Sequence, residues 1–240
     1  MKKIIISLIT IFSLGVGFAQ ENTFVTDAKA EKRTLSSHFA GIEVSDGVDL
    51  YITQGNEESV AISASEEKYK ERFKTVVENG VLKIYFDSKG INWAINEKRK
   101  LKAWVSFKTL EKLHASGGAD VKTSGNLKLD DLDMKFTSGS SFNGKMAANT
   151  LSVDQNSGSV INITGSASSL KIEVSSGAVF KGYDLSVDFC DAKASSGGGV
   201  RITINKELNA KANSGGGIRY KGDAVIKDMN VNSGGMVKKA

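Results

Sequence analysis

The chain has 240 residues, a formal net charge of +5 and 40% hydrophobic residues, with 25 glycines, one cysteine and no proline. This hydrophobic fraction excludes a disordered or collagen-like chain, and the single cysteine excludes an internal disulfide. A mildly basic charge does not indicate a nucleic-acid partner. Because proline is absent, every backbone N–H can join a hydrogen-bond ladder.

The first 19 residues have the pattern of a secretory signal peptide. Lys2 and Lys3 form a short positive region, residues 4–18 are almost wholly apolar, and small residues precede a cleavage position after Ala19. We therefore expect an exported protein, in the periplasm, at the outer-membrane surface or outside the cell. No later stretch is long and apolar enough for an integral membrane span. Residues 20–33 have little apolar pattern and are expected to form a flexible linker.

Residues 34–113 are predicted to be rich in β-strands. Alternating apolar and polar residues, which are typical of strands with one buried face, occupy residues 42–44, 48–52, 60–62, 81–86 and 101–105. A turn at Asn79-Gly80 precedes the fourth of these runs. Only Ser65–Phe73 has a helical pattern, with Ser65 as its N-cap. We expect this segment to cover one end of the segment that follows it.

Residues 114–240 contain an internal repeat. A Ser-Gly dipeptide recurs with spacings of 22, 19, 19, 20, 18 and 19 residues, at Ser116, Ser138, Ser157, Ser176, Ser196, Ser214 and Ser233. Four residues after each serine stand Asp120, Phe142, Ile161, Phe180, Val200, Ile218 and Val237. All but the first are apolar, and they alternate with polar residues. This period predicts an all-β fold in which a β-solenoid turns a corner at each Ser-Gly dipeptide.

Three further segments support a family resemblance: "FAGIEVSDGVDLYITQG" at 39–55, "VENGVLKIYF" at 77–86 and "ASGGAD" at 115–120. Together with the Ser-Gly repeats, they resemble the putative auto-transporter adhesins with a head GIN domain, which are exported proteins of Bacteroidetes. The resemblance covers residues 39–240. It implies a right-handed β-helix-like fold and an adhesive role, and it brings no catalytic residues with it.

Two patterns resemble ligand sites but fit the repeat better. Residues 139–146 match a phosphate-binding loop except that Met146 replaces the hydroxyl residue that binds Mg²⁺, and their glycines have the register of a repeat corner. Calcium-binding β-rolls carry an aspartate in every turn, whereas Asp120 is alone in its column. His38 and His114 lack metal-ligand spacing. We therefore expect no cofactor and no metal site.

Acidic residues leave a carbohydrate-active alternative open. Asp130, Asp131 and Asp133 cluster between two repeats, while Asp188 and Asp191 flank Cys190. Glycosidases place two carboxylates about 5 to 9.5 Å apart, and neighbouring repeats could do the same. Charged residues are also usual on exposed strand faces. Cys190 shares a column with leucines and is predicted to pack inside the solenoid.

Two tryptophans and a basic run are candidate ligand contacts. Trp104 lies within an alternating run and is predicted to be core, and the basic run 98–102 is interpreted as a solvated hairpin end. Trp93 is therefore the candidate ligand contact.

The sequence predicts an exported, non-catalytic surface or periplasmic module that is adhesin-like or structural. The partner expected is a surface glycan or matrix ligand, and a homo-oligomer is left open. The alternative is a carbohydrate-binding or polysaccharide-degrading β-helix protein.

Overall fold

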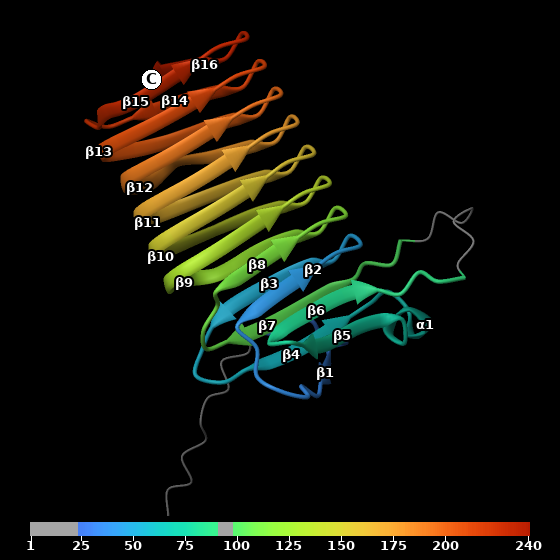
Figure 1. Ribbon diagram of the computed structural model, residues 1–240. Helices are drawn as coiled ribbons and strands as arrows, with labels where there is room; N and C mark the ends of the chain where they lie inside the picture. Colours follow the sequence, from blue (N-terminus) through green and yellow to red (C-terminus); the bar gives the residue numbers. More distant parts are fainter. Residues whose placement is uncertain (1–23, 91–97) are drawn as a thin grey trace, which may run out of the picture.

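The computed structural model of the protein describes residues 24–90 and 98–240. Sixteen strands in these residues join into one sheet that winds into a β-solenoid of about seven turns (Figure 1). The predicted all-β solenoid fold is therefore confirmed. The expected signal peptide, residues 1–19, and Trp93 lie outside the described residues.

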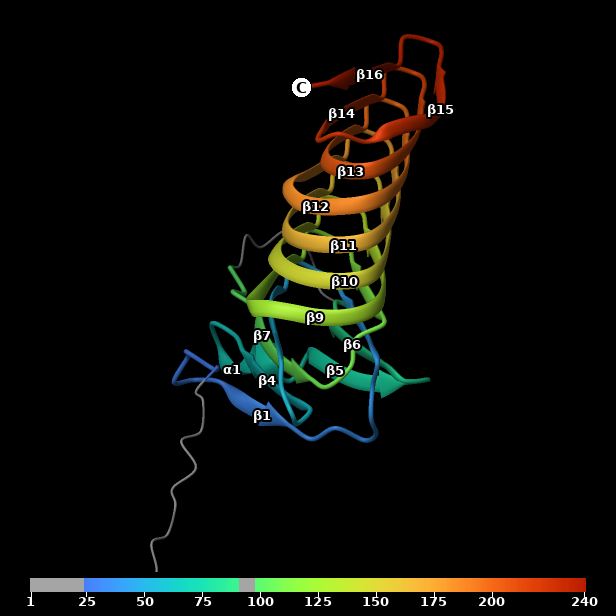
Figure 2. The same cartoon turned by 90° about the vertical axis from the view of Figure 1, so that its left-hand side faces the viewer.

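Five long strands form the body of the solenoid: β9 Asp120–Phe136, β10 Ser141–Gln155, β11 Val160–Val174, β12 Val179–Ala194 and β13 Gly199–Ala212. Each bends round the solenoid, as Figure 2 shows, and pairs in parallel with the next. The shorter β14 Gly217–Lys221, β15 Val225–Val231 and β16 Met236–Lys239 continue the winding. Each long strand leaves one Ser-Gly turn and bends before it leads into the next. We call the side of the solenoid formed by the stretches that lead into the turns the pre-turn face, and the side formed by the stretches that leave the turns the post-turn face.

The Ser-Gly dipeptides form the tight corners that the repeat predicts. Ser157 and Gly158 have φ angles of 52° and 72°, so both central turn residues are left-handed, as in a type I′ turn. The amide of Ser159 closes this turn on the carbonyl of Asn156 at 3.2 Å. The amide of Gly158 donates to the carbonyl of Ser176 in the next rung at 3.1 Å. Each corner is thus stacked on the next by backbone hydrogen bonds.

The first corner differs from the prediction. Its left-handed positions are Gly117 and Gly118, with φ angles of 57° and 76°, so Ser116 lies one residue before its expected place. The strand β9 also carries two extra residues relative to β10 between residues 122 and 126. The displaced corner places Val121 opposite Phe142, and the extra residues then bring Leu127 opposite Met146. The expectation that Asp120 occupies the apolar column was wrong, because the turn selects left-handed conformations and not a particular dipeptide.

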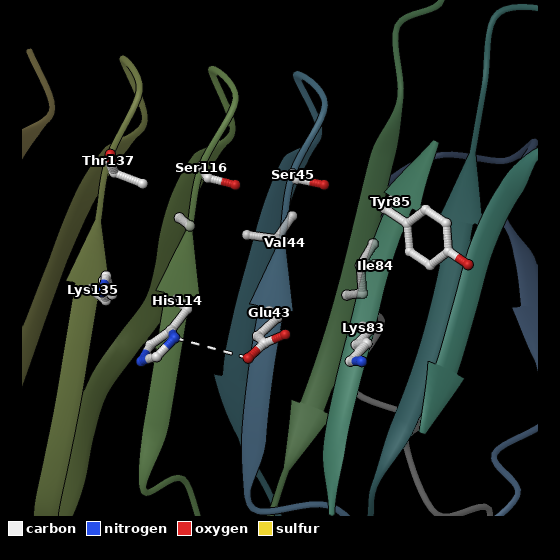
Figure 3. Close-up of a pocket in the computed structure, with 11 residues that line it drawn as sticks. Glu43, Val44, Ser45, Lys83, Ile84, Tyr85, His114, Ser116, Lys135 and Thr137 are labelled. Atoms are coloured by element: carbon white, nitrogen blue, oxygen red, sulfur yellow. Dashed lines mark ion pairs between the residues drawn. The ribbon is translucent and has the colours of Figure 1, made fainter. Parts of the chain in front are cut away.

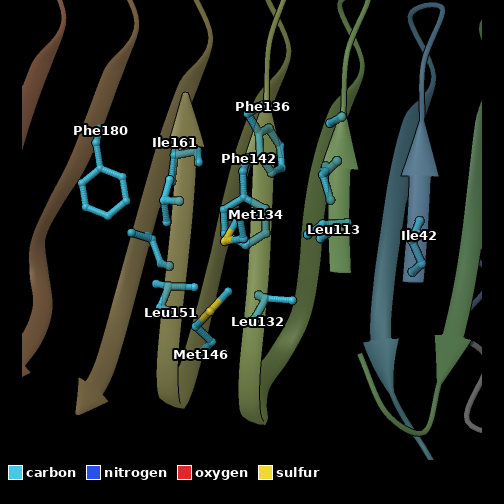
Figure 4. Close-up of a cluster of buried hydrophobic side chains, with 14 of the residues drawn as sticks. Ile42, Leu113, Leu132, Met134, Phe136, Phe142, Met146, Leu151, Ile161 and Phe180 are labelled. Carbon is cyan, nitrogen blue, oxygen red and sulfur yellow. The ribbon is translucent and has the colours of Figure 1, made fainter. Parts of the chain in front are cut away.

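Four members of the predicted apolar column are confirmed. Ile161, Phe180, Val200 and Ile218 pair in register on consecutive strands, and each is at most 1% exposed. Figure 4 shows the first two of them in the cluster of buried side chains between the two faces. Cys190 is also buried, in register with Leu170 and Leu208. Burial, with a smaller contribution from Asp191, raises the pKa of its thiol to about 12, so Cys190 is an unreactive core residue.

The N-terminal strands extend both faces and then close the end. On the post-turn face β3 Asp49–Gln54 pairs in parallel with β9 and with β7 Lys102–Phe107. On the pre-turn face β2 Gly41–Val44 pairs in parallel with β8 Lys112–Ala115 and β6 Val81–Phe86. The antiparallel strands β4 Ser59–Ser63 and β5 Phe73–Glu78 lie outside β7 and β6. They cover the edges that the last parallel rung would expose, so the predicted cap is confirmed.

Two details of the cap differ from expectation. The strand β1 Glu31–Arg33 pairs with β4, although residues 31–33 belong to the stretch expected as a linker. The helix α1 spans only Glu67–Lys70, and the Ser65 hydroxyl donates to the Lys98 carbonyl at 3.0 Å and does not cap the helix. The predicted helix is shortened because Phe73 already belongs to β5, where it pairs with Phe86.

Candidate functional site

The in-register strands stack outward-facing side chains into columns, and one column on the pre-turn face consists of ionisable side chains. Its members, in spatial order from the cap, are Lys83, Glu43, His114, Lys135, Asp154, Glu173, Lys193 and Lys211. Opposite charges meet in this column at Lys135–Asp154, 3.6 Å, and Lys193–Glu173, 2.7 Å. The pre-turn face is therefore largely neutralised by ion pairs between rungs.

A hollow of about 370 Å³ lies where this column crosses β6, β2, β8 and β9. Figure 3 shows Lys83, Glu43, His114 and Lys135 side by side on its floor. The Nδ1 atom of His114 lies 3.9 Å from Oε1 of Glu43, and its Nε2 atom lies 3.7 Å from Oδ2 of Asp133. Partial burial, and then the charge of Lys112, lower the pKa of His114 despite these two carboxylates. This shift favours the neutral form of the imidazole.

The hollow does not hold a nucleophile activated by His114. Ser45 and Ser116 line it, but the Ser45 hydroxyl donates to Asp46 at 2.7 Å. No hydrogen bond joins His114 to either serine in the part of the chain that the structure describes. A nucleophile and its base must lie within hydrogen-bond reach. The arrangement is a polar surface hollow in which Glu43 is held by Lys112 at 2.8 Å, a bond that lowers the pKa of Glu43.

We expect His114 to make the fold less stable in mild acid. Its pKa lies below the ordinary value of about 6.5, so below that pH the unfolded chain binds the proton more readily than the folded chain. The melting temperature should fall between about pH 7.5 and about pH 5.5, and His114→Gln should reduce this fall. A His114→Gln variant that keeps the parent's full pH dependence would contradict the assignment.

The structure brings Asp130, Asp131 and Asp133 together, at a second hollow of about 650 Å³. All three side chains are exposed. A glycosidase acid needs a raised pKa, which burial in an apolar site provides. Gln54 also borders this hollow and exchanges two hydrogen bonds of 2.8 Å with the backbone of Lys128. The cluster therefore lacks the enclosure that acid catalysis requires.

The acids beside Cys190 do not form a pair either. Asp188 accepts hydrogen bonds from Lys206 at 2.7 Å and Asn205 at 3.3 Å, and these bonds lower its pKa, the bond from Lys206 most. Asp191 is half-buried and in register with Lys171 and Asn209 on the pre-turn face. Neither residue has the environment of a general acid.

One carboxylate pair was missed by the sequence analysis. Asp49 and Asp120 lie opposite each other on β3 and β9. Partial burial raises the pKa of Asp49, and the charge of Asp120 adds to this effect. Burial tends to raise the pKa of Asp120, but hydrogen bonds from Lys122 and Ser141 outweigh this effect and lower the pKa of Asp120. The sequence analysis missed this pair because the expected register placed Asp120 among apolar residues. The Asp46-Gly47 corner could have revealed the pair, since it aligns β3 with the repeats.

The remaining candidates are mostly structural. Residues 139–146 run from a corner into β10. In that corner the Gly139 amide donates to the Ser157 carbonyl at 3.0 Å, so the repeat-corner interpretation is confirmed. Trp104 is buried and stacks on Tyr51 with ring centroids 5.7 Å apart, which confirms it as core. In the basic run, Arg99 lies 4.4 Å from the ring of Phe86.

Within the described residues no group of three His, Cys, Asp or Glu side chains is placed to hold a metal ion. In the same residues no helix has the length and hydropathy of a membrane span.

Comparison with known proteins supports a family assignment for the chain. The profile of the family described as putative auto-transporter adhesin, head GIN domain, matches residues 38–224. The chain belongs to this family. A search of curated proteins finds no match.

Solved structures share the fold of this head GIN domain protein. One is described as a putative adhesin from Bacteroides fragilis, with a TM-score of 0.78 and 18% identity over 89% of this chain and 98% of that chain. A second is a putative adhesin from Parabacteroides merdae, with a TM-score of 0.63 and 20% identity over 89% and 97% of the two chains. A third is described as a putative lipid binding protein from Parabacteroides distasonis, with a TM-score of 0.60 and 18% identity over 89% and 98%. At these identities the similarity establishes the fold.

Proposed function

We propose that the protein is an exported, non-catalytic binding module of the adhesin type, and that the outer faces of its solenoid bind a surface glycan or matrix ligand. The observation that carries the proposal is the register of the outward columns over about seven turns. A solenoid repeats the same side-chain positions rung after rung, so individually weak polar contacts add along one ligand.

The site geometry supports binding over turnover. His114 has no activated nucleophile beside it, and the clustered acids at residues 130–133 are exposed. Family membership and the signal-peptide pattern at residues 1–19 support export to the periplasm, the outer-membrane surface or the exterior. Self-association belongs to the proposal as well, since clustered copies strengthen weak contacts.

Glycan and matrix-protein arrays test this function. The purified protein is applied in soluble form and clustered on beads, and ligands are examined by mass spectrometry for cleavage. We expect binding that strengthens on clustering and leaves the ligand intact. Turnover of a polysaccharide would establish the degrading alternative, and absence of binding even in clustered form would refute the adhesin function. Trp93→Ala tests the candidate aromatic contact in the same assay.

A further inference from the structure

A row of four cations runs along the C-terminal half of the post-turn face. Lys181, Arg201, Arg219 and Lys238 lie directly opposite one another on β12, β13, β14 and β16, which follow each other along the solenoid (Figure 1). All four side chains are exposed. Neighbouring strands are about 4.8 Å apart, so like charges recur at that spacing over three steps. We call these four residues the cation row.

The cation row has no compensating acids. None of its members forms an ion pair with any residue that the structure describes. By contrast, Lys193 in β12 pairs with Glu173 at 2.7 Å, and Lys211 in β13 pairs with Asp228 at 3.8 Å. Like charges directly opposite on adjacent strands are destabilising. The fold thus neutralises its pre-turn face and leaves an uncompensated positive line on its post-turn face, and an anionic ligand would relieve that repulsion.

The backbone beside the row leaves room for a ligand. The outward positions two residues before Arg201 and Arg219 are Gly199 and Gly217. A Cβ atom at Gly199 would meet nothing within 4 Å, and one at Gly217 would meet only the end of Met236 at 3.6 Å. A chain-like ligand can therefore lie against the sheet and reach both guanidinium groups, whose planar forks bind carboxylate or sulfate with two hydrogen bonds.

The same column continues with Asn162 and Asn143 in the two preceding rungs. Side-chain amides both donate and accept hydrogen bonds, which suits sugar hydroxyls. Stacking platforms for nucleic-acid bases need open aromatic faces. Tyr183, two residues after Lys181, is covered by the Lys221 ammonium at 4.4 Å, and Tyr51, further along the same column, is stacked on Trp104. Cations followed by amides in one straight column favour a linear acidic polysaccharide over a nucleic acid.

We propose that the cation row, with Asn162 and Asn143, binds a linear polysaccharide that carries a carboxylate or sulfate on its repeating sugars and lies along the solenoid axis. This inference rests on the proposed glycan-binding function and specifies the chemical class of the ligand. Several anionic groups of one chain then contact successive rungs at once, whereas a small anion contacts one or two.

The test compares two double variants of the full protein with the same loss of charge. Arg201→Gln/Arg219→Gln removes the centre of the row, and Lys193→Gln/Lys211→Gln removes two cations from the pre-turn face of the same region. Binding to polygalacturonate is measured with dextran as the neutral polysaccharide. We expect the first variant to lose at least about tenfold in affinity, and the second less than about twofold, since its cations are exposed and already paired. The first variant should melt no lower than the parent, because repulsion is removed.

The other outcomes are distinguishable. Equal losses in both variants would show that net charge alone attracts the polymer and would overturn the cation row. Binding to dextran but not to polygalacturonate would overturn this inference and leave the glycan-binding function standing. Binding to neither would count against both. Single-stranded oligothymidylate and phosphatidylglycerol vesicles are included, and tighter, row-dependent binding to either would replace the polysaccharide with that ligand.

Discussion

We expect Ile161→Asp to abolish the cooperative folding of the solenoid. Ile161 is 0% exposed and packs in register between Phe142 and Phe180. A carboxylate buried there without a partner costs several kcal/mol, which is comparable with the whole stability of about 5 to 15 kcal/mol of a typical domain. Circular dichroism during urea unfolding should show loss of the cooperative transition.

The adjacent substitution Asn162→Asp provides the control. Asn162 is exposed on the post-turn face, one residue further along β11. Exposed substitutions usually change the free energy of unfolding by less than about 0.5 kcal/mol. Equal damage from the two substitutions would contradict the assignment of the buried and exposed sides of β11.

The buried columns could be predicted because two periods coincide in the sequence. Alternation with period two separates inside from outside along each strand, and the spacing of 18 to 20 residues between corners aligns equivalent positions. Ile161, Phe180, Val200 and Ile218 follow from these periods alone. Their prediction needed no side-chain detail, because a one-residue slip would expose the whole column.

The first rung could not be placed in this way, because the physical requirement of the corner is conformational. Two adjacent left-handed residues are needed, and Gly117-Gly118 and Asp46-Gly47 supply them as well as Ser-Gly does. A pattern based on serine therefore misplaced Asp120 and did not extend the rungs to β2 and β3. The Asp49–Asp120 pair and the His114 hollow both depend on those strands.

The cation row illustrates a second limit. Arg201 and Arg219 stand at the same place in two nearly identical corners, so their alignment is visible in the sequence. Whether charges in a column are compensated depends on side chains from neighbouring rungs and bends. That information required the structure.

We expect Gly165→Ala to lower the free energy of unfolding by about 3 kcal/mol or more. Gly165 has a φ angle of 118°, in a region that is closed to residues with a side chain and alone costs about 1 to 3 kcal/mol. An added Cβ would lie 1.9 Å from the carbonyl oxygen of Met146 in the preceding rung, so the backbone of β10 or β11 would have to move. Urea unfolding of the variant and the parent measures the difference.

Gly158→Ala separates the close approach from the backbone conformation. Gly158 has a φ angle of 72°, and an added Cβ would meet nothing within 4 Å. The free energy of unfolding of this variant should therefore fall only by about 1 kcal/mol, which is the cost of a left-handed conformation for a residue with a side chain. Gly199→Ala, with neither a positive φ angle nor a neighbour within 4 Å, should leave stability unchanged. If Gly165→Ala were no more damaging than Gly158→Ala, the close approach of Gly165 in β11 to the Met146 carbonyl in β10 would be contradicted. The ordering of the three variants therefore tests how tightly successive rungs stack at the bend opposite the Ser-Gly corners.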